Sequence, residues 1–360
     1  MHKNDKRNPR TVAHYLSFTL AIILSCISVS FPLALPVGEN TALAASVNQD
    51  RVLIPGGMTF GVKMETRGVL VVGFSRSIEG EKSPAELAGI QRGDLLLTLD
   101  RQTVNTAAEL LLAIESSNGR ALSVSLERNG KTLEKTLTPK ADAEGTYRAG
   151  LRVRDGTAGI GTVTAIDPAT LTFVGLGHGI CDSDTGVLMP LRQGKIYDVS
   201  ISSIRKGASG APGEIQGYFS QDACGVLLEN TRYGVTGRMS GKCFNDITPV
   251  PVARRDEITT GKATVICTLG DGVRREYGIR IVKITNPDGP DKNFVIEVTD
   301  ESLLSQTGGI VQGMSGSPIM QNGKLVGAVT HVTVNEPTKG YGIFIENMLN
   351  AAEMPIACAS

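Results

Sequence analysis

The chain has 360 residues, and its 36 basic and 36 acidic side chains give a formal net charge of zero. This balance excludes the basic surface typical of a nucleic-acid-binding protein, so we expect no nucleic-acid partner. With 42 glycines and no tryptophan, the chain is long enough for two modest domains rich in turns and short strands. Its six cysteines are irregularly spaced and form no C-x-x-C pair, so we predict no disulfide framework, no bound metal and no cofactor.

The N-terminal segment, residues 1–45, has the features of a targeting sequence. Basic residues up to Arg10 precede the uncharged apolar run Tyr15–Pro36, and the small residues of Ala42–Ala45 follow at signal-peptidase spacing. We therefore expect export and contact with a membrane. Two outcomes stay open, because the apolar run is long enough to anchor the chain but can also be removed by cleavage.

The next segment, residues 51–138, mixes short strands with two short helices. The flexible Pro55–Gly61 leads into an alternating strand. Ser83–Glu86 and Thr106–Glu109 are both capping boxes that predict helix starts. Asn129-Gly130 predicts a hairpin turn between two further strands.

This arrangement, with Gly-Ile-Gln-Arg-Gly-Asp-Leu-Leu-Leu at its centre, resembles a bacterial PDZ domain. Such domains bind a peptide as an added strand and hold its terminal carboxylate with loop amides. The resemblance places the offered strand at Phe60–Met64 and a pocket beside the second helix. An alternative is a structural domain whose groove is filled from within. The resemblance implies these groove residues: Gly57, Met58, Thr59, Phe60, Gly61, Thr106 and Leu110.

After a polar linker at 139–146, strands and turns continue to about Ile345, and a last helix is predicted at Glu346–Glu353. Near the end of this region, Gly313 and Gly316 flank Ser315, and Asn322-Gly323 predicts a hairpin. The loop resembles the nucleophile loop of chymotrypsin-like peptidases, which predicts an all-β serine peptidase domain over residues 147–360. The amides of Gly313 and Ser315 would form its oxyanion hole. A second Gly-x-Ser-Gly copy at Ser209 leads into a turn instead.

A nucleophilic serine needs a base, and only four histidines are present. His2 and His14 flank the basic N-terminus, and His331 lies beyond the nucleophile. His178, in a glycine-flanked turn after a short apolar run, is left as the base, and its position before Ser315 matches the chymotrypsin order.

Asp300 is the candidate third member, since it closes the apolar run Asn293–Thr299 where a strand gives way to a loop. A carboxylate there could orient the imidazole of His178. The alternative is that Asp300 caps the short helix predicted at Glu301–Ser305, which the bare sequence favours.

The whole chain resembles the stage IV sporulation protein B family of endospore-forming bacteria. Its specific parts are Gly175–Ile180 and the stretch from Val298 to Glu346. The resemblance implies catalytic His178, Asp300 and Ser315. It also implies a peptidase that crosses the forespore inner membrane, cleaves itself and cuts a membrane-bound inhibitory regulator of an intramembrane protease, leading to sigma factor activation.

The expected fold is therefore mainly β: a membrane or signal segment, a small α+β PDZ domain and a chymotrypsin-like peptidase domain. We expect a peptide or protein substrate, including the chain itself in trans through the PDZ groove. The site of action would be the space between forespore and mother cell, with the chain membrane-anchored until cleaved. The alternative function is a catalytically silent PDZ adaptor that binds peptide tails in the same compartment.

Overall fold

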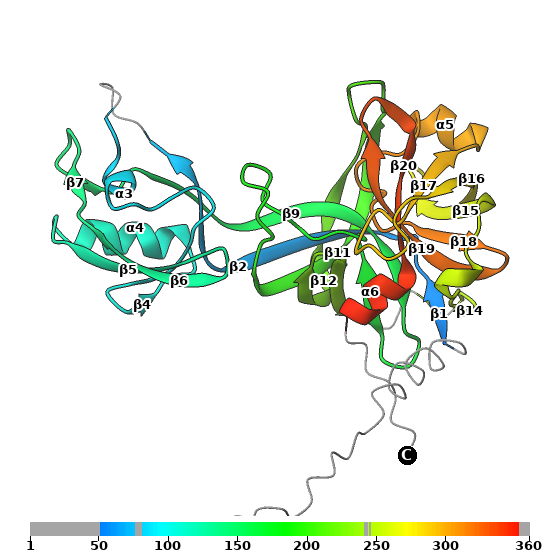
Figure 1. Ribbon diagram of the computed structural model, residues 1–360, viewed down its shortest axis with the longest axis horizontal. Helices are drawn as coiled ribbons and strands as arrows, with labels where there is room; N and C mark the ends of the chain where they lie inside the picture. Colours follow the sequence, from blue (N-terminus) through cyan, green and yellow to red (C-terminus); the bar gives the residue numbers. More distant parts are fainter. Residues whose placement is uncertain (1–50, 76–80, 241–243, 245, 353–360) are drawn as a thin grey trace, which may run out of the picture. The chain divides into compact units, whose positions relative to one another are not determined.

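The computed structural model describes residues 51–75, 81–240, 244 and 246–352. The predicted signal or anchor segment, residues 1–45, lies outside these described residues. Among the helices that are described, none is long and apolar enough to cross a membrane. The fold is mainly β, as predicted, with two barrels and a PDZ domain (Figure 1).

The first barrel closes because strand β2 pairs on both of its edges. It pairs with β11 on one side and with β9 on the other, so the strands return on themselves in the order β9-β10-β13-β12-β11-β2. A short strand β1 joins β9 to β14 outside this ring. The bounds are β1 Val52–Pro55, β2 Thr59–Phe74, β9 Leu151–Ile166, β10 Thr172–Gly175, β11 Leu191–Arg205, β12 Glu214–Thr231, β13 Gly234–Met239 and β14 Val250–Pro251.

The second barrel is closed in the order β15-β16-β17-β20-β19-β18. Phe294 and Phe344 pack in its core with ring centroids 5.4 Å apart. The predicted hairpin joins β18 to β19, where Asn322 and Gly323 take φ of 52° and 74°. The bounds are β15 Gly261–Thr268, β16 Arg274–Ile284, β17 Phe294–Val298, α5 Glu301–Thr307, β18 Pro318–Gln321, β19 Lys324–Thr333, β20 Glu336–Phe344 and α6 Ile345–Ala351.

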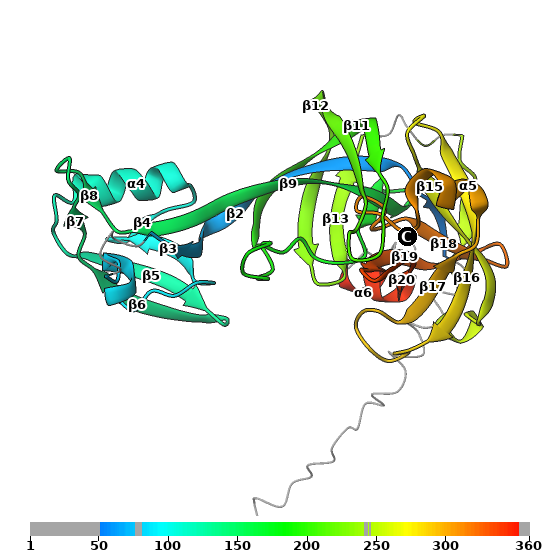
Figure 2. The ribbon, with the colours of Figure 1, turned by 90° about the horizontal axis from the view of Figure 1, so that it is seen from above.

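The PDZ domain is an insertion in the first barrel, since the chain leaves that barrel in β2 and returns to it in β9 (Figure 2). Both predicted capping boxes are present, at Ser83 and at Thr106. The expected linker at 139–146 includes β7, which pairs with β8. The bounds are α3 Pro84–Leu87, β3 Leu95–Leu99, β4 Gln102–Thr103, α4 Ala107–Ser116, β5 Leu122–Arg128, β6 Lys131–Leu137, β7 Lys140–Ala141 and β8 Tyr147–Arg148.

The predicted PDZ boundary at residue 51 therefore needs correction. Residues 59–65 of β2 pair with β9 and β11 of the first barrel, and only the later part of β2 pairs with β3 of the PDZ domain. The alternating burial over Val62–Arg67 gives way to a continuous buried run over Gly68–Val71, where the strand passes into the PDZ domain. The peptidase thus includes chain on both sides of the PDZ insertion.

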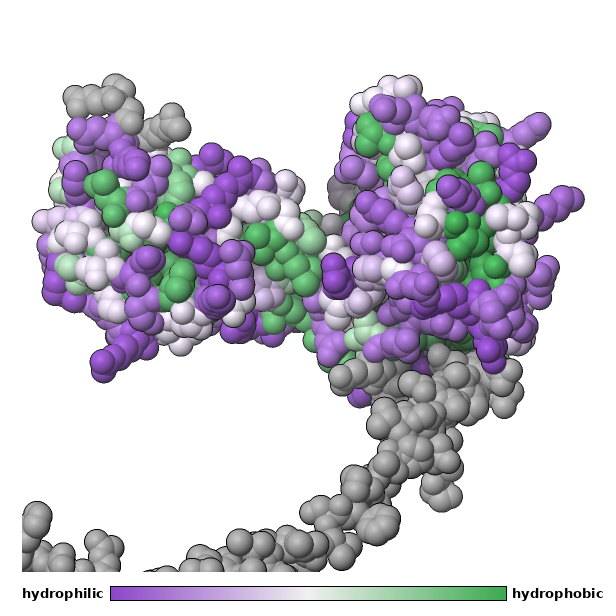
Figure 3. Space-filling model, in the orientation of Figure 1, coloured by the Kyte–Doolittle hydropathy of each residue, from purple (hydrophilic) through white to green (hydrophobic). Residues whose placement is uncertain are grey.

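Apolar side chains on the face shown in Figure 3 lie in several separate patches among polar ones. Leu87 and Leu112 are exposed in the PDZ domain, and Tyr218 is exposed in the first barrel. Scattered exposed apolar residues of this kind are ordinary for soluble domains. The surface seen from this side therefore does not point to one docking area.

Candidate active site

His178 follows β10 through a turn in the left-handed region, where Leu176 and Gly177 both have φ of 67°. A Cβ on Gly177 would lie 3.0 Å from Thr330 Cγ2, so glycine lets the first barrel approach β19 closely. The half-buried imidazole places Nδ1 3.0 Å from the Gly179 carbonyl oxygen. Because a carbonyl only accepts, Nδ1 carries the proton and Nε2 is left as the basic nitrogen.

Ser315 lies in the loop between α5 and β18, and glycines with positive φ shape that loop. Gly313 has φ of 99° and Gly316 has φ of 95°. A Cβ on Gly316 would lie 2.0 Å from the Thr162 carbonyl oxygen, so no other residue fits there without a shift of the backbone. The nucleophile loop therefore packs directly against β9 of the first barrel.

Two buried threonine hydroxyls of β9 hold this loop. Thr162 donates to the Gly313 carbonyl and Thr164 to the Gly316 carbonyl, each at 2.7 Å. Within the described part of the chain, the amides of Gly313 and Ser315 donate to no protein group. These two amides are the predicted oxyanion-hole donors, and both are free to bind a substrate carbonyl oxygen.

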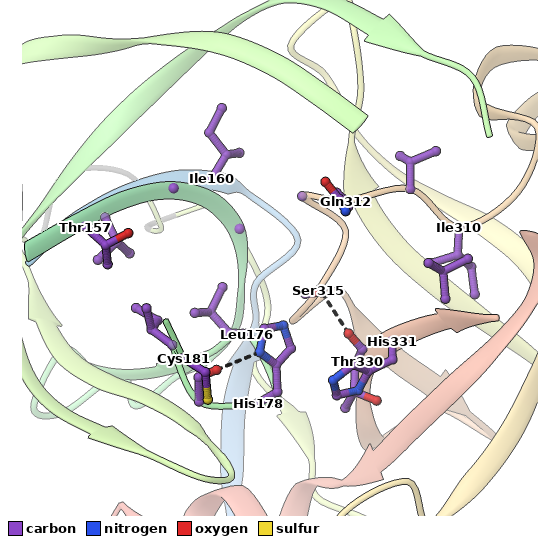
Figure 4. Close-up of a pocket in the computed structure, with 18 of the residues that line it drawn as sticks. Thr157, Ile160, Leu176, His178, Cys181, Ile310, Gln312, Ser315, Thr330 and His331 are labelled. Atoms are coloured by element: carbon purple, nitrogen blue, oxygen red, sulfur yellow. Dashed lines mark hydrogen bonds between the residues drawn. The ribbon is translucent and has the colours of Figure 1, made fainter. Parts of the chain in front are cut away.

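His178 and Ser315 line one cleft with a volume of about 390 Å³ (Figure 4). The Ser315 hydroxyl donates to the Thr330 carbonyl oxygen at 2.8 Å, so it is turned toward β19 and away from the imidazole. Rotation about its Cα–Cβ bond moves the hydroxyl between staggered positions without moving the loop. Catalytic hydrogen bonds often form only when substrate binds. The structure thus brings the predicted base and nucleophile into the same cleft.

A second histidine, His331, also lines this cleft, although the elimination from sequence set it aside as the base. The rings of His178 and His331 have centroids 4.9 Å apart and planes inclined by 37°. Desolvation, with a smaller contribution from the nearby His178, lowers the pKa of His331 to about 4. The signal was present in the sequence, because the predicted hairpin turns the chain back beside Ser315. His331 is therefore uncharged at neutral pH.

Burial also tunes the other two ionisable side chains of the cleft. Desolvation lowers the pKa of His178, although its hydrogen bond to Gly179 opposes this. The imidazole is then neutral at physiological pH, as a general base must be. Desolvation raises the pKa of the Cys181 thiol, which also lines the cleft. Cys181 is therefore a poor source of thiolate.

Asp300 is placed apart from His178. It is the N-cap of α5, where Oδ1 accepts from the Leu303 amide at 3.0 Å and Oδ2 accepts from the Gly278 amide at 3.2 Å. It does not line the cleft, and among the described residues the His178 ring is bonded only to Gly179. The structure shows the capping alternative, and the catalytic role of Asp300 stays a prediction.

Ser209 lies on the connection between β11 and β12, exposed to solvent. Its hydroxyl donates to the Asn335 carbonyl oxygen at 2.9 Å. It does not line the cleft that holds His178. The second Gly-x-Ser-Gly copy is therefore part of a turn, as expected.

The predicted PDZ carboxylate loop and ligand strand are wrong. Gly57, Met58, Thr59, Phe60 and Gly61 lie where the chain enters the first barrel, and Phe60 is packed edge-to-face on Phe173 in its core. The Gly57 carbonyl accepts a hydrogen bond from Thr268 of the second barrel. The alternating pattern correctly predicted a strand with one buried face. It did not specify which domain covers that face.

The two helix residues of the predicted groove are already engaged within the PDZ domain. Thr106 caps α4 with its hydroxyl, and Leu110 is buried in the PDZ core. The chain's own residues lie beside α4, because Asp155 of β9 accepts from the Ala107 amide at 2.8 Å. Arg148 of β8 also pairs with Glu115 at 2.7 Å. These contacts favour the alternative in which the groove is filled from within.

Metal chemistry finds no support among the described residues, where no group of three or more histidine, cysteine, aspartate or glutamate side chains could hold a metal ion. The two histidines of the cleft are adjacent, but a third ligand does not complete the set.

A protein-family model described as SpoIVB peptidase S55 matches residues 145–349, and a PDZ domain model matches residues 56–138. The chain belongs to the SpoIVB peptidase S55 family. It is a serine peptidase with a PDZ domain. The PDZ match begins at residue 56, although residues 59–65 are paired inside the first barrel.

Two curated relatives match short segments of this S55 peptidase. Zinc metalloprotease RasP of Shouchella clausii is 36% identical over 61 residues, which cover 17% of this chain and 15% of that protein. A putative zinc metalloprotease of Bartonella henselae is 34% identical over 86 residues, covering 24% and 23%. The matches span less than a quarter of either relative.

Two solved structures are similar to parts of this chain. The active form of the Rv3671c protease from M. tuberculosis has a TM-score of 0.34 and 14% identity, covering 57% of this chain and 76% of that one. The PDZ domain of an SdrC-like protein from Listeria monocytogenes has a TM-score of 0.21 and 22% identity, covering 24% and 87%.

The cleft of the S55 peptidase provides the groups that acyl transfer requires. In the predicted mechanism, Nε2 of His178 would take the proton of the Ser315 hydroxyl as Oγ attacks the peptide carbonyl carbon. The amides of Gly313 and Ser315 would donate to the oxygen that becomes negative. The imidazolium would then protonate the departing amine, and water would repeat the sequence on the acyl-enzyme to free the acid and restore Ser315.

Proposed function

We propose that this chain is an exported serine endopeptidase that cleaves itself and then cuts a membrane-bound regulatory protein during endospore formation. In this proposal the cut releases an intramembrane protease, which processes a mother-cell sigma factor and so carries a signal between compartments. The observation that carries the proposal is the cleft shared by His178 and Ser315 in a chain of the S55 family.

The proposed site of action is the space between forespore and mother cell, reached across the forespore inner membrane. The basic N-terminus and the uncharged run at 15–36 support export, with anchoring until cleavage. The ordered barrel begins close by, since the Arg51 side chain pairs with Asp167 at 3.2 Å and β1 starts at Val52. A cut upstream of Arg51 therefore leaves every described strand in place, which suits self-cleavage that releases an active peptidase.

In the same proposal the chain is also its own substrate in trans, with the PDZ domain contributing to recognition. Phe60–Met64 cannot serve as the ligand strand, because β9 and β11 already pair with it. Recognition by the PDZ domain must therefore use other parts of its surface. Self-cleavage itself requires only that the segment before Arg51 enter the cleft of a second molecule.

A silent adaptor is the competing proposal, but no observation in the cleft favours it. The predicted base, nucleophile and oxyanion residues His178, Ser315 and Gly313 all line the same cleft. An adaptor would have no requirement for the buried threonine contacts that shape the nucleophile loop.

The proposal is tested with the full chain in lipid vesicles, followed by mass spectrometry over time. The parent should lose its segment before Arg51, whereas Ser315→Ala should stay intact alone and be cut when the parent is added. Loss of the same segment from isolated Ser315→Ala would exclude self-cleavage. Adding a vesicle-bound regulator tests the second step, and a regulator left intact by an active parent would refute the signalling role while leaving the peptidase assignment standing.

A further inference from the structure

The position of the oxyanion amides fixes where the residue before the scissile bond must lie. Its carbonyl carbon meets Ser315 Oγ while its carbonyl oxygen meets the amides of Gly313 and Ser315. Its side chain is then directed to the wall formed by the nucleophile loop and β19. Figure 4 shows Ile310 on this side of the cleft, near Thr330 and His331.

This wall is apolar and rigid. Ile310, Val311 and Val332 line the cleft here, and we call these three residues the acyl-side recess. Ile310 and Val311 are buried at 2% and 1% exposure within the core of the second barrel. Because close-packed core side chains have little freedom to move aside, the recess keeps its shape when a substrate enters.

The Ile310 side chain packs closely against strand β20. A Cβ on Gly340 of β20 would lie 2.5 Å from Ile310 Cδ1 and 2.6 Å from the His331 carbonyl oxygen. The Ile310 side chain therefore already occupies the space above Gly340. Removing its outer carbons should therefore enlarge the recess without replacing a residue of a strand.

The absence of charged side chains restricts which substrate side chains the recess can accept. The described residues that line the cleft include no aspartate, glutamate, lysine or arginine. Both histidines there have lowered pKa values and are uncharged at neutral pH. A charged substrate side chain would lose its hydration in the recess without gaining a charged partner, which disfavours its binding.

We propose that the acyl-side recess selects small uncharged aliphatic residues, such as alanine and valine, before the scissile bond, and that Ile310 sets the upper size limit. This inference rests on the peptidase activity of the proposed function and specifies its substrate class. The segment expected to be self-cleaved fits this class, since residues 44–47 read Ala-Ala-Ser-Val.

The test compares the full-length parent with Ile310→Ala on a peptide library in which only the residue before the scissile bond varies. The parent should show its highest kcat/KM for alanine and valine, roughly 10-fold or more above phenylalanine, lysine or aspartate. Ile310→Ala should raise kcat/KM for leucine and phenylalanine by roughly 10-fold. Ile310→Val is the milder variant if the alanine variant does not fold, and it should shift the order in the same direction.

Ile281→Ala is the matched control, because Ile281 is equally buried in the same core but does not line the cleft. It should lower the melting temperature and leave the order of preference unchanged. A parent that prefers lysine, aspartate or phenylalanine, or an unchanged order in Ile310→Ala, would overturn the inference.

A second readout separates this inference from the proposed function. Peptidyl phosphonate esters carrying alanine, valine or phenylalanine label Ser315 without turnover, and the mass of the adduct gives the labelling rate. Faster labelling by alanine and valine supports the recess even if self-cleavage fails, whereas fastest labelling by phenylalanine refutes it even if self-cleavage succeeds.

Discussion

The nucleophile loop and strand β2 differ in how much of their structure is determined locally. The loop takes its shape from its own glycines, since Gly313 and Gly316 adopt φ values that other residues rarely reach. Strand β2 takes its shape from its partners, because its alternating residues need only some apolar surface to cover. Local conformation was therefore predictable, while the choice of partner was not.

The largest effects are expected in the cleft. Ser315→Ala removes only a hydroxyl from a loop held by β9, so the fold should remain while peptide turnover falls at least a thousandfold. His178→Ala should be about as damaging, and the double variant no worse, because the two residues act as one unit. Turnover of a model peptide and circular dichroism measure both effects.

Ser209→Ala is the control for that prediction, since Ser209 shares the motif but lies outside the cleft. It should turn over peptide like the parent. An inactive Ser209→Ala beside an active Ser315→Ala would reverse the assignment of the nucleophile.

The next largest expected effect is the loss of stability on substitution of a buried residue of strand β2. Phe60 is 1% exposed in the core of the first barrel, so Phe60→Asp should lower the free energy of unfolding by more than about 3 kcal/mol and abolish turnover together with the fold. Leu112→Asp is the control, because Leu112 is exposed on α4. If Phe60→Asp unfolded at the parent's urea midpoint, β2 would not belong to the barrel.

A pair of substitutions distinguishes the two possible roles of Asp300, the cap of α5 and the third catalytic residue. Asp300→Ala removes the cap of α5 and should cost about 1 kcal/mol of stability in urea unfolding. Asp300→Asn keeps an acceptor for the Leu303 amide but carries no charge, so it should be closer to the parent in stability. Parental turnover by Asp300→Asn would assign the residue to the cap, whereas a stable but inactive variant would assign it the third catalytic role.

The smallest expected effect is on pH dependence. Because the pKa of His178 is lowered from the ordinary histidine value of 6.5, the imidazole stays neutral below pH 6.5. The acid limb of kcat/KM should therefore lie below pH 6.5.

The second histidine affects the pH dependence of stability. The pKa of His331 is about 4, so the unfolded chain binds a proton between pH 6.5 and 4 that the folded chain does not. Stability should fall as the pH falls through that window.

His331→Gln separates the two histidines in that pH experiment. This variant lacks the side chain that takes up a proton on unfolding. The stability of His331→Gln should therefore fall less between pH 6.5 and 4 than that of the parent. Melting temperatures at several pH values measure the difference. Identical pH dependence in both proteins would show that His331 does not titrate in this window.

Several elements of the fold followed directly from the sequence. The capping boxes at Ser83 and Thr106 and the hairpin at Asn322-Gly323 are short-range signals, and all are present. His178 and Ser315 were predictable as partners, because few histidines compete and the loop motif is local. The approach of His331 to His178 depends on how two barrels pack, which no single segment encodes.

The domain boundary and the role of Asp300 could not be predicted from the sequence. The amino-acid sequence of Gly57–Met64 resembles that of a PDZ domain. Pairing with β9 and β11 nevertheless places this stretch in the first barrel. Asp300 fits both a helix cap and a catalytic carboxylate by type and position. Sequence spacing does not contain the three-dimensional distance between Asp300 and His178, so it could not separate those roles.

Labelling with a fluorophosphonate tests the central claim most directly, namely that Ser315 is a nucleophile activated by His178. The full-length parent is treated with the probe at neutral pH, and the adduct is located by peptide mass spectrometry. We predict one adduct on Ser315 in the parent, none in Ser315→Ala and greatly slowed labelling in His178→Ala. Labelling at Ser209 or Cys181 in place of Ser315, or an unlabelled parent that is fully folded, would contradict the account.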